Sequence, residues 1–478
     1  MSRFLQSSLA AALALALTAC AGGVDSNVKA TLETELPDRF SEVMPVSDVV
    51  IDGPWWRSFG DADMDALVEQ GLAYNSDLII GAARLREAAA AFRQTRSAQL
   101  PDVGVFVGGS RQRSPSSSVP GTSVISESGN FGVSVGFEVD LWGRLSAQST
   151  AARQRYLAQG YTQAALRQVI AAELVRGYLG AQSLIARRVV LQENVALLEA
   201  SLGLAQRRYA LGAISELDLQ RSVSELEDSR AQLAAVEQQS AASQRALLVL
   251  AGQMPTEQAL KSLTVRALDL APRDLPEIPA GLPSSLLERR PDLRAAEANL
   301  AAGQADVSAA RRALLPSLSL TGSAGRASGD LSDILSGPHL DIWSIGADLI
   351  ATIFDGGRRR GVIAAAQARE EQLVETYRNT VRNALRETLD ALDARTAAVQ
   401  IHESRQAQAH ALANAAKLAD RRYQEGYDSY LNVIDARRSL LSARQATIEA
   451  KRAAGAAYVD LVLALGGGWD GQVVSAAP

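Results

Sequence analysis

The stretch FGVSVGFEVDL, residues 131–141, places an apolar side chain at every second position and a small or acidic one between them. The stretch WSIGADLIATI, residues 343–353, repeats this alternation, and Val139 falls on Ile353 at an offset of 214. Alternation over about ten residues is typical of a membrane-spanning strand with one face toward lipid and one toward water. An edge strand of a soluble sandwich alternates equally well, but the chain has few other β segments to cover the apolar face. We therefore expect transmembrane strands.

These stretches belong to an internal duplication. The matching landmarks are 77–78 with 292–293, 100–101 with 315–316, 142–144 with 356–358, 208–212 with 422–426, and 247–252 with 461–466. The offset drifts by one residue, from 215 to 214, across the whole series. Each copy has the same plan of helix, two strands, long helix, sharp turn and returning helix, so we expect two similar halves.

Proline-free segments predict very long helices. No proline occurs from 121 to 254 or from 339 to 477. The 68 steps from Gly143 to Leu211 correspond to about 100 Å of α-helix, about three times the ~30 Å hydrocarbon core of a bilayer. Such a rod, joined to membrane strands, must project well beyond the membrane.

Local signals predict where the helices end. One helix is expected from Asp61 to about Leu100, where Pro101 stops it. Each long helix is expected to turn at a glycine and to return from an N-cap, namely Gly212 with Ser215 in the first copy, and Gly426 with Asp428 or Ser429 in the second.

The number of strands predicts an oligomer. One chain supplies four such strands, whereas single-chain outer membrane barrels begin at about eight. Because four strands cannot close, the barrel must be shared between chains. We therefore expect an obligate oligomer.

The N-terminus resembles a bacterial lipoprotein signal. Arg3 precedes an apolar run, 5–17, that is too short to span a bilayer. Small residues then lead to Cys20, the one cysteine of the chain, which is the expected lipidation site. The alternative is an ordinary secretion signal with an incidental cysteine. Ala21 in place of an aspartate favours the outer membrane, by resemblance to lipoproteins of this kind.

Composition and motifs argue against an enzyme. The net charge is −5 with mixed signs, so no nucleic-acid partner is expected. Neither a glycine-rich phosphate loop after a strand nor a nucleophile elbow is present. His402 and His410 lie too far apart to share a metal without other ligands, and we interpret them as solvated helix residues. We expect no catalytic residue, metal or cofactor.

Three consecutive arginines, Arg358, Arg359 and Arg360, open the second long helix. Cations oppose the helix macrodipole at this end, so the helix itself does not require them. Where strand becomes rod they would lie near inner-leaflet headgroups and could meet phosphate, forming a membrane-interface basic cluster. The alternative is a solvated cluster paired with Glu370 or Glu371.

The hairpin tips carry matching polar residues. These are Tyr209, Gly212 and Asp218 in the first copy and Tyr423, Gly426 and Asn432 in the second, with Asp435 one turn further. If several chains close a tube, each of these residues forms a ring, and a ring of carboxylates attracts cations and repels anions. The alternative for Asp218 and Asp435 is that acids in the first turns of a helix are favoured by its dipole.

The chain resembles the TolC-like outer membrane factors (outer membrane efflux proteins), in the lipoprotein subgroup of the OprM and NodT type. The residues that carry the resemblance are WRSF at 56–59, GLPSSLLERRPDL at 281–293, FDGGR at 354–358, RRYQEG at 421–426 and ALGGGW at 464–469. The resemblance implies a mainly α chain with transmembrane β-strands. It further implies a homotrimer that shares a 12-stranded outer membrane β-barrel, continued by a 12-helix periplasmic α-barrel.

The resemblance also implies a periplasmic gate made by tyrosine, aspartate and arginine. Tyr423 matches the gate tyrosine, Asp218 its partner in the first repeat, and Asp435 the second of two acidic positions. Two positions depart from the family pattern, since Asp428 stands where some members have the gating arginine and Asn432 stands at the first acidic position. Fewer or differently paired closing bonds are therefore expected, with one ring carboxylate per chain and threefold chemistry at the mouth.

The expected function is a passive outer membrane exit duct of a tripartite efflux system. Its partners would be a periplasmic adaptor protein and an inner membrane pump of the resistance-nodulation-division type, together with outer membrane lipid. The alternatives are the outer membrane component of type I protein secretion and a structural coiled-coil lipoprotein without a pore.

The expected organisation runs as follows: a lipoprotein signal peptide (1–19), a lipid-anchored arm (20–60), repeat one (61–254, with a β-hairpin at 101–141), a Pro-rich equatorial linker (255–290), repeat two (291–468, with a β-hairpin at 316–354) and a tail (469–478).

Overall fold

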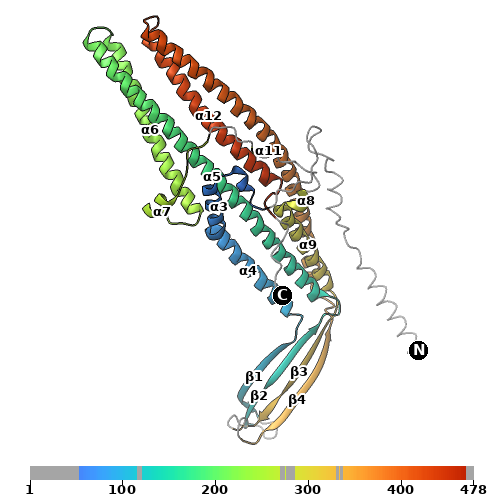
Figure 1. The fold of residues 1–478 in the computed structure, drawn as a ribbon. Coiled ribbons are helices and arrows are strands. Elements are labelled where there is room, and N and C mark those ends of the chain that lie inside the picture. The colour runs from blue at the N-terminus through green and yellow to red at the C-terminus, as the bar shows by residue number, and fades with distance from the viewer. Residues whose placement is uncertain are drawn as a thin grey trace. The chain divides into compact units, whose positions relative to one another are not determined.

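The computed structural model describes residues 53–115, 121–269, 275, 286–329, 333 and 337–469. They are mainly helical with one four-stranded sheet (Figure 1). The elements are η1 (Trp55–Phe59), α3 (Ala62–Tyr74), α4 (Ser76–Ser97), β1 (Asp102–Pro115), β2 (Ser123–Val139), α5 (Arg144–Ala210), α6 (Glu216–Leu250), α7 (Glu257–Ser262), α8 (Leu286–Arg289), α9 (Pro291–Arg312), β3 (Ser317–Ser328), β4 (Leu340–Ile350), α11 (Arg358–Gln424) and α12 (Tyr430–Ala464). Cys20 lies outside the described residues.

The described residues fall into two compact units. One contains 85–159 and 295–378, which include the sheet, and the other contains 53–84, 160–294 and 379–469. Each unit draws matching segments from both repeats, so the repeats and the compact units are different divisions of the chain.

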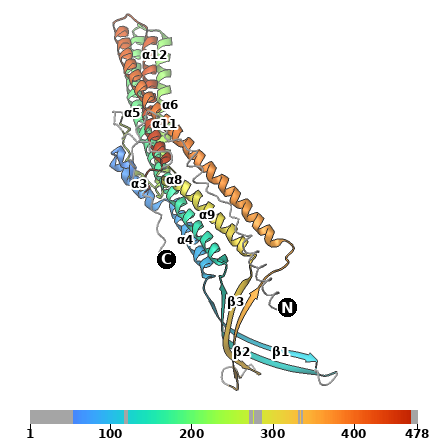
Figure 2. The same cartoon turned by 90° about the vertical axis from the view of Figure 1, so that its right-hand side faces the viewer.

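The sheet has the order β1-β2-β3-β4 with all neighbours antiparallel (Figures 1 and 2). Its register aligns the alternation of both copies, because Val105, Val133, Ala324 and Trp343 form one row across the four strands. The apolar positions therefore share one face. On β2 that face extends from 131 to 139, eight steps or about 27 Å, which is close to the ~25 Å apolar band of outer membrane barrels. The expected four alternating strands are confirmed.

Hydrogen bonds fix how the strands of this unit meet its helices. Trp142 Nε1 donates to the carbonyl of Pro316 at 2.7 Å, and Arg312 Nη1 donates to the carbonyl of Gly143 at 2.7 Å. Each bond joins a residue of one repeat to a residue of the other. The two hairpins of the sheet are thus held to one another where the helices begin.

The second unit contains most of two helical hairpins of equal size, with α5 entering it at residue 160 and α11 at residue 379. α5 and α11 have 67 residues each, and α6 and α12 have 35 each. Gly212 and Gly426 turn the chain with φ of 70° and 84°, which the absence of a side chain permits. Ser215 caps α6 through its side chain, whereas Ser429 caps α12 without a side-chain hydrogen bond.

The helix expected from Asp61 to Leu100 is wrong in one respect, because it is two helices. Asn75 breaks it with an extended backbone, φ −60° and ψ 131°. Its Oδ1 accepts the N–H groups of Asp77 and Leu78 at 2.9 and 3.1 Å, and so caps α4. Its Nδ2 donates to the carbonyl of Leu250 at 2.8 Å. The break is therefore stabilised by a hydrogen bond to the end of α6. Helix propensity depends on local sequence and does not include such a long-range bond.

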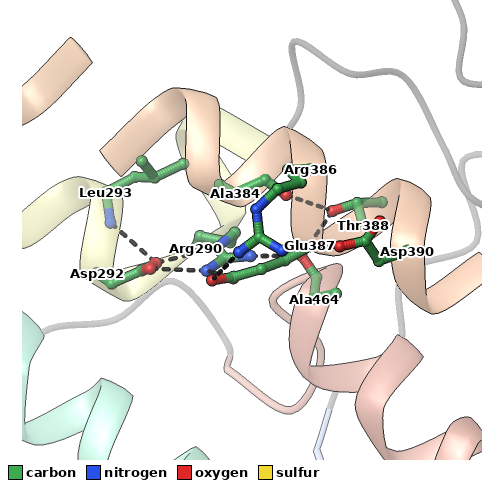
Figure 3. A network of polar contacts seen from close by, with 9 residues as sticks. All are labelled: Arg290, Asp292, Leu293, Ala384, Arg386, Glu387, Thr388, Asp390 and Ala464. Carbon is green, nitrogen blue, oxygen red and sulfur yellow. Dashed lines mark hydrogen bonds and ion pairs between the residues drawn. The ribbon is translucent and has the colours of Figure 1, made fainter. Parts of the chain in front are cut away.

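In the second repeat a buried arginine makes the equivalent contact between the start of the short helix and the end of the returning helix (Figure 3). We call this contact the joint of each repeat. Arg290, the counterpart of Asn75 at an offset of 215, is 8% exposed. Its Nη1 donates to the carbonyl of Ala464 at 3.1 Å, and its Nη2 donates to Asp292 and Glu387, both at 2.8 Å. Burial opposes its charge, but the two carboxylates outweigh burial and raise its pKa. One guanidinium thus joins α9, α11 and α12.

A glycine completes each joint. Gly252 has φ 76°, and a Cβ there would lie 2.2 Å from the carbonyl oxygen of Tyr74. Gly466 has φ 73°, and its Cβ would lie 2.7 Å from the carbonyl oxygen of Arg289. Tyr74 and Arg289 are themselves counterparts at an offset of 215. The end of each returning helix therefore passes too close to the chain for any side chain.

His402 is not the solvated residue that the sequence indicated. It is 9% exposed and continues the 3-and-4 spaced buried seam of Ala384, Thr388 and Ala391 on α11. Burial, and then the nearby Lys451, lower the pKa of its imidazole below the ordinary value of 6.5, and Glu403 acts in the opposite direction. His402 is therefore a packed, neutral side chain at neutral pH.

Gly252→Ala should lower the unfolding temperature of the purified protein, because it adds backbone strain and a clash with Tyr74 that together cost about 2 kcal/mol or more. The matched control is Gly203→Ala within α5, where a Cβ meets nothing within 4 Å and alanine is the better helix former by about 1 kcal/mol. Circular dichroism during heating provides the measurement. Equal midpoints for the two variants would show that the close approach at Gly252 carries no packing constraint.

Arg290→Lys should also lower the unfolding temperature, although it keeps the charge. A lysine cannot donate to Asp292, Glu387 and Ala464 at once, because it lacks the planar fork of donors. The expected loss is about 1–3 kcal/mol. Arg289→Lys, one residue earlier, is the control and should leave the midpoint unchanged. A loss of similar size in both variants would contradict a specific role for Arg290.

Candidate functional site

The hairpin tips lie in one unit, and a direct contact joins them. Arg208 Nη1 donates to the hydroxyl of Tyr423 at 2.8 Å. The same guanidinium lies over the Tyr423 ring, 5.1 Å from its centroid, a distance at which a cation is attracted to the ring face. Tyr430 packs on Tyr423 with ring centroids 5.3 Å apart. Within the described tips, then, Tyr423 bonds Arg208 and not Asp218.

Asp218 takes part in the cap of its own helix. Ser215 Oγ accepts the backbone N–H of Asp218 at 3.2 Å, and it donates to Asp218 Oδ2 at 2.7 Å. Arg221 lies 3.8 Å from the other carboxylate oxygen. The carboxylate is thus used at the start of α6, where the helix dipole also favours it. Tyr209 is exposed beside this tip.

The two positions that depart from the family pattern bond to one another. Asn432 Nδ2 donates to Asp428 Oδ1, which also accepts the backbone N–H of Ser429 at 2.9 Å. Arg422 Nε donates to Asp428 Oδ2 at 3.3 Å. The bonds from Asn432, then from Ser429 and Arg422, hold the pKa of the Asp428 carboxyl below its ordinary value. Asp428 therefore stays ionised at neutral pH and orders the second tip.

Asp435 is exposed on α12 and makes no hydrogen bond or close ion pair with any described residue. Its charge acts on Arg438, one turn further along the helix, where it adds to the stronger effect of Glu225 in raising the pKa of the guanidinium. Of the tip residues singled out by sequence, Asp428, Asn432 and Tyr423 are brought into local networks. The carboxylate of Asp435 is exposed and has no hydrogen-bond or ion-pair partner among the described residues.

A partly buried ion pair between the hairpins, with Glu225 buried and Arg438 exposed, escaped the sequence reasoning. Arg438 Nε on α12 donates to Glu225 Oε2 on α6 at 2.6 Å, and Glu225 is 8% exposed. Beside it, Arg437 donates to Asp420 at 2.7 Å and to Ser201 at 2.9 Å. The signal in the sequence was weak, because Glu225 is one acid in the buried seam that includes Ser222, Leu226 and Ser229.

The three arginines at the start of α11 have different environments. Arg359 donates to the carbonyl of Ala313 at 2.8 Å and to Thr352 Oγ1 at 2.5 Å, and it lies 3.6 Å from Asp355. Arg358 and Arg360 are exposed, and among the described residues their side chains form no hydrogen bond or ion pair. The alternative reading, a pairing with Glu370 or Glu371, is not what the structure has for Arg359.

Metal-ligating side chains are scattered in the part of the chain that the structure describes. No group of three or more His, Cys, Asp or Glu side chains there is arranged to hold a metal ion. The candidate site is therefore a set of polar contacts at the hairpin tips and a basic junction at the base of the sheet.

Comparison with known proteins places these features in context. A family model described as "Outer membrane efflux protein" matches twice, over residues 67–253 and 282–467, which confirms the duplication. Outer membrane protein OprJ of Pseudomonas aeruginosa is 35% identical over 418 residues, covering 87% of this chain and 86% of OprJ. Cation efflux system protein CusC of Escherichia coli is 30% identical over 465 residues, 96% of this chain and 98% of CusC.

A solved structure gives the same result for the fold. The outer-membrane channel OprN has a TM-score of 0.81 with 31% identity, and the match covers 91% of this chain and 96% of that one. The mainly helical, internally duplicated fold with a four-stranded sheet is thus shared with a solved outer membrane channel.

A double-mutant cycle on Glu225→Gln and Arg438→Gln should give a coupling of about 1 kcal/mol in unfolding free energy. This value lies below that of a fully buried pair, because the Arg438 side chain is 58% exposed. The matched cycle uses Glu199 and Arg230, which are 2.8 Å apart and both about half exposed, and should give almost no coupling. Equal couplings would mean that burial of Glu225 adds nothing.

Proposed function

We propose that this chain works as a homotrimeric, gated exit duct. It belongs to the outer membrane efflux protein family and is an outer membrane channel of an efflux pump, not an enzyme. The observation that supports a barrel shared between chains is the open sheet. In the order β1-β2-β3-β4, the outer edges of β1 and β4 have no partner strand among the described residues. Unpaired backbone groups are not tolerated in lipid.

Pairing of β4 with β1 of a neighbouring chain would satisfy these edges. Three chains would give twelve strands, above the minimum of about eight for a closed barrel. The same symmetry would arrange the hairpins as twelve helices of a periplasmic tunnel. We infer three chains, and no other number, from the family resemblance, and closure itself from the requirement of the strand edges.

The proposed gate is the set of tip residues. Threefold symmetry turns Asp435 into a ring of three carboxylates and places Asp218 and Asn432 at alternating tips. The Arg208–Tyr423 bond at 2.8 Å and the Asp428–Asn432 bond would hold the tips in a closed arrangement. Contact with a partner protein would open the duct by exchanging these bonds for others.

The proposed anchor and partners follow from sequence. Lipid on Cys20 would tether the N-terminus to the inner leaflet of the outer membrane, and two signals together give firm attachment. A periplasmic adaptor and an inner membrane pump, of the resistance-nodulation-division type, would supply cargo and energy. CusC is named for cation efflux, but a generic lumen does not select cargo, so the transporter would determine the substrate.

The carboxylate ring can be tested by planar-bilayer recording on the purified trimer, with its mass verified by native mass spectrometry. Asp435→Ala should reduce cation selectivity and weaken block by Mg²⁺ several-fold, because it removes the negative charge that concentrates cations at the constriction. The control is Glu371→Ala, which removes an equal charge from an exposed position on α11 far along the chain from the tip.

Unchanged traces in Asp435→Ala would contradict the ring. A folded protein that is monomeric and never conducts would contradict the duct itself and would favour a structural coiled-coil lipoprotein. The two failures are therefore distinguishable in one experiment.

A further inference from the structure

The apolar face of the sheet continues into the segment that leads to α11. Leu318 and Leu349 pair at the helical end of that face. Beyond them, Ile353 and Phe354 are 98% and 88% exposed. An apolar face that ends in an exposed aromatic residue is the pattern of a membrane–water boundary. The start of α11 lies near the helical end of the strands (Figure 2), and we therefore infer that it is at the level of the lipid headgroups.

Charges at the opposite end of the sheet are paired within the sheet. Arg111 lies 2.9 Å from Glu127 and Arg326 lies 3.6 Å from Asp341, and each pair is a register pair of neighbouring strands. In this sheet, arginine charges are thus neutralised by acids on the neighbouring strand.

The first repeat also neutralises its strand-to-helix junction. Arg144, the counterpart of Arg358, donates to both oxygens of Glu138 at 2.6 and 2.7 Å. In the second repeat the position of Glu138 is occupied by Thr352, at the same offset of 214. The acid has been lost in the second copy, while the number of arginines has risen from one to three.

Among the described residues, none of the remaining acids near the second junction forms an ion pair with Arg358 or Arg360. Asp355 accepts the backbone N–H groups of Gly357 and Arg359 at 3.1 and 3.2 Å and also contacts the Arg359 side chain. Asp348 lies on the polar face of β4, next in the chain to the apolar-face residue Leu349. Arg359 is held by Ala313 and Thr352, which leaves Arg358 and Arg360 available on either side of it.

We propose that Arg358 and Arg360, which flank Arg359 at the start of α11, bind phosphate groups of anionic phospholipids in the periplasmic leaflet of the outer membrane. The proposal rests on the outer membrane channel assignment, because lipid is present only if the sheet is inserted. Cations at the start of a helix are repelled by the positive end of its dipole. A lipid phosphate would offset this repulsion, which no described side chain of this junction offsets for Arg358 and Arg360. Basic residues near an anionic membrane surface each contribute to lipid attraction. The repeat-one junction, with its Arg144–Glu138 pair, does not bind lipid in this way.

The test uses the full-length trimer in neutral detergent, titrated with phosphatidylglycerol or with phosphatidylcholine, and native mass spectrometry counts the lipid retained per chain. Wild type should retain phosphatidylglycerol in preference to phosphatidylcholine. The double variant R358Q/R360Q should bind phosphatidylglycerol about tenfold more weakly. The matched control R369Q/R382Q removes two exposed arginines further along α11 and should bind as wild type does.

Three further outcomes bear on the occupant. Inorganic phosphate at the same concentration should not displace the lipid, and full displacement would show a free-anion site instead. Dissociation of the R358Q/R360Q trimer in the absence of lipid would show that a neighbouring chain's carboxylates are the partners, and would overturn the proposal. Equal lipid retention by all three proteins would also overturn it. Conductance of R358Q/R360Q in neutral lipid reports separately on the channel function.

Discussion

The rest of the molecule depends on one requirement, that every backbone N–H and C=O group inside a bilayer has a hydrogen-bond partner. Four antiparallel strands satisfy it only between themselves and leave the outer edges of β1 and β4 open. The alternation that makes one face apolar therefore also makes a solitary chain untenable in lipid. Pairing with strands of neighbouring chains would complete those two edges, and the proposed shared lumen and ring of matching tips would follow from that pairing.

The duplication shows how the two halves of this chain have diverged around the same backbone. Asn75 and Arg290 both donate to the last carbonyls of a returning helix, and a glycine follows at the same place in both. The donor in the first repeat is the neutral amide of Asn75. The donor in the second repeat is the buried guanidinium of Arg290, which also pairs with two carboxylates. The contact is the same in both repeats while its electrostatics differ.

Much of the fold could be predicted because its signals are periodic and local. Alternation identified both hairpins of the sheet, and the long proline-free segments identified α5 and α11. The break at Asn75 was missed because its stabilising bond goes to Leu250, 175 residues away. At the candidate gate, the residue types were found by matching the repeats. Their partners were not, since Arg208 reaches Tyr423 and Arg438 reaches Glu225 only after both hairpins have packed.

The equal lengths of the matched helices limit how such a chain can evolve. α5 and α11 have 67 residues each, and α6 and α12 have 35. A single inserted residue turns everything beyond it by about 100° and moves it by about 1.5 Å along the axis. An insertion in α5 alone would carry Arg208 away from Tyr423 and rotate the seam out of contact. Changes of length must therefore occur together in both hairpins or be confined to the connections between strands. The length of the helical part of the duct can then change only when all four long helices change together.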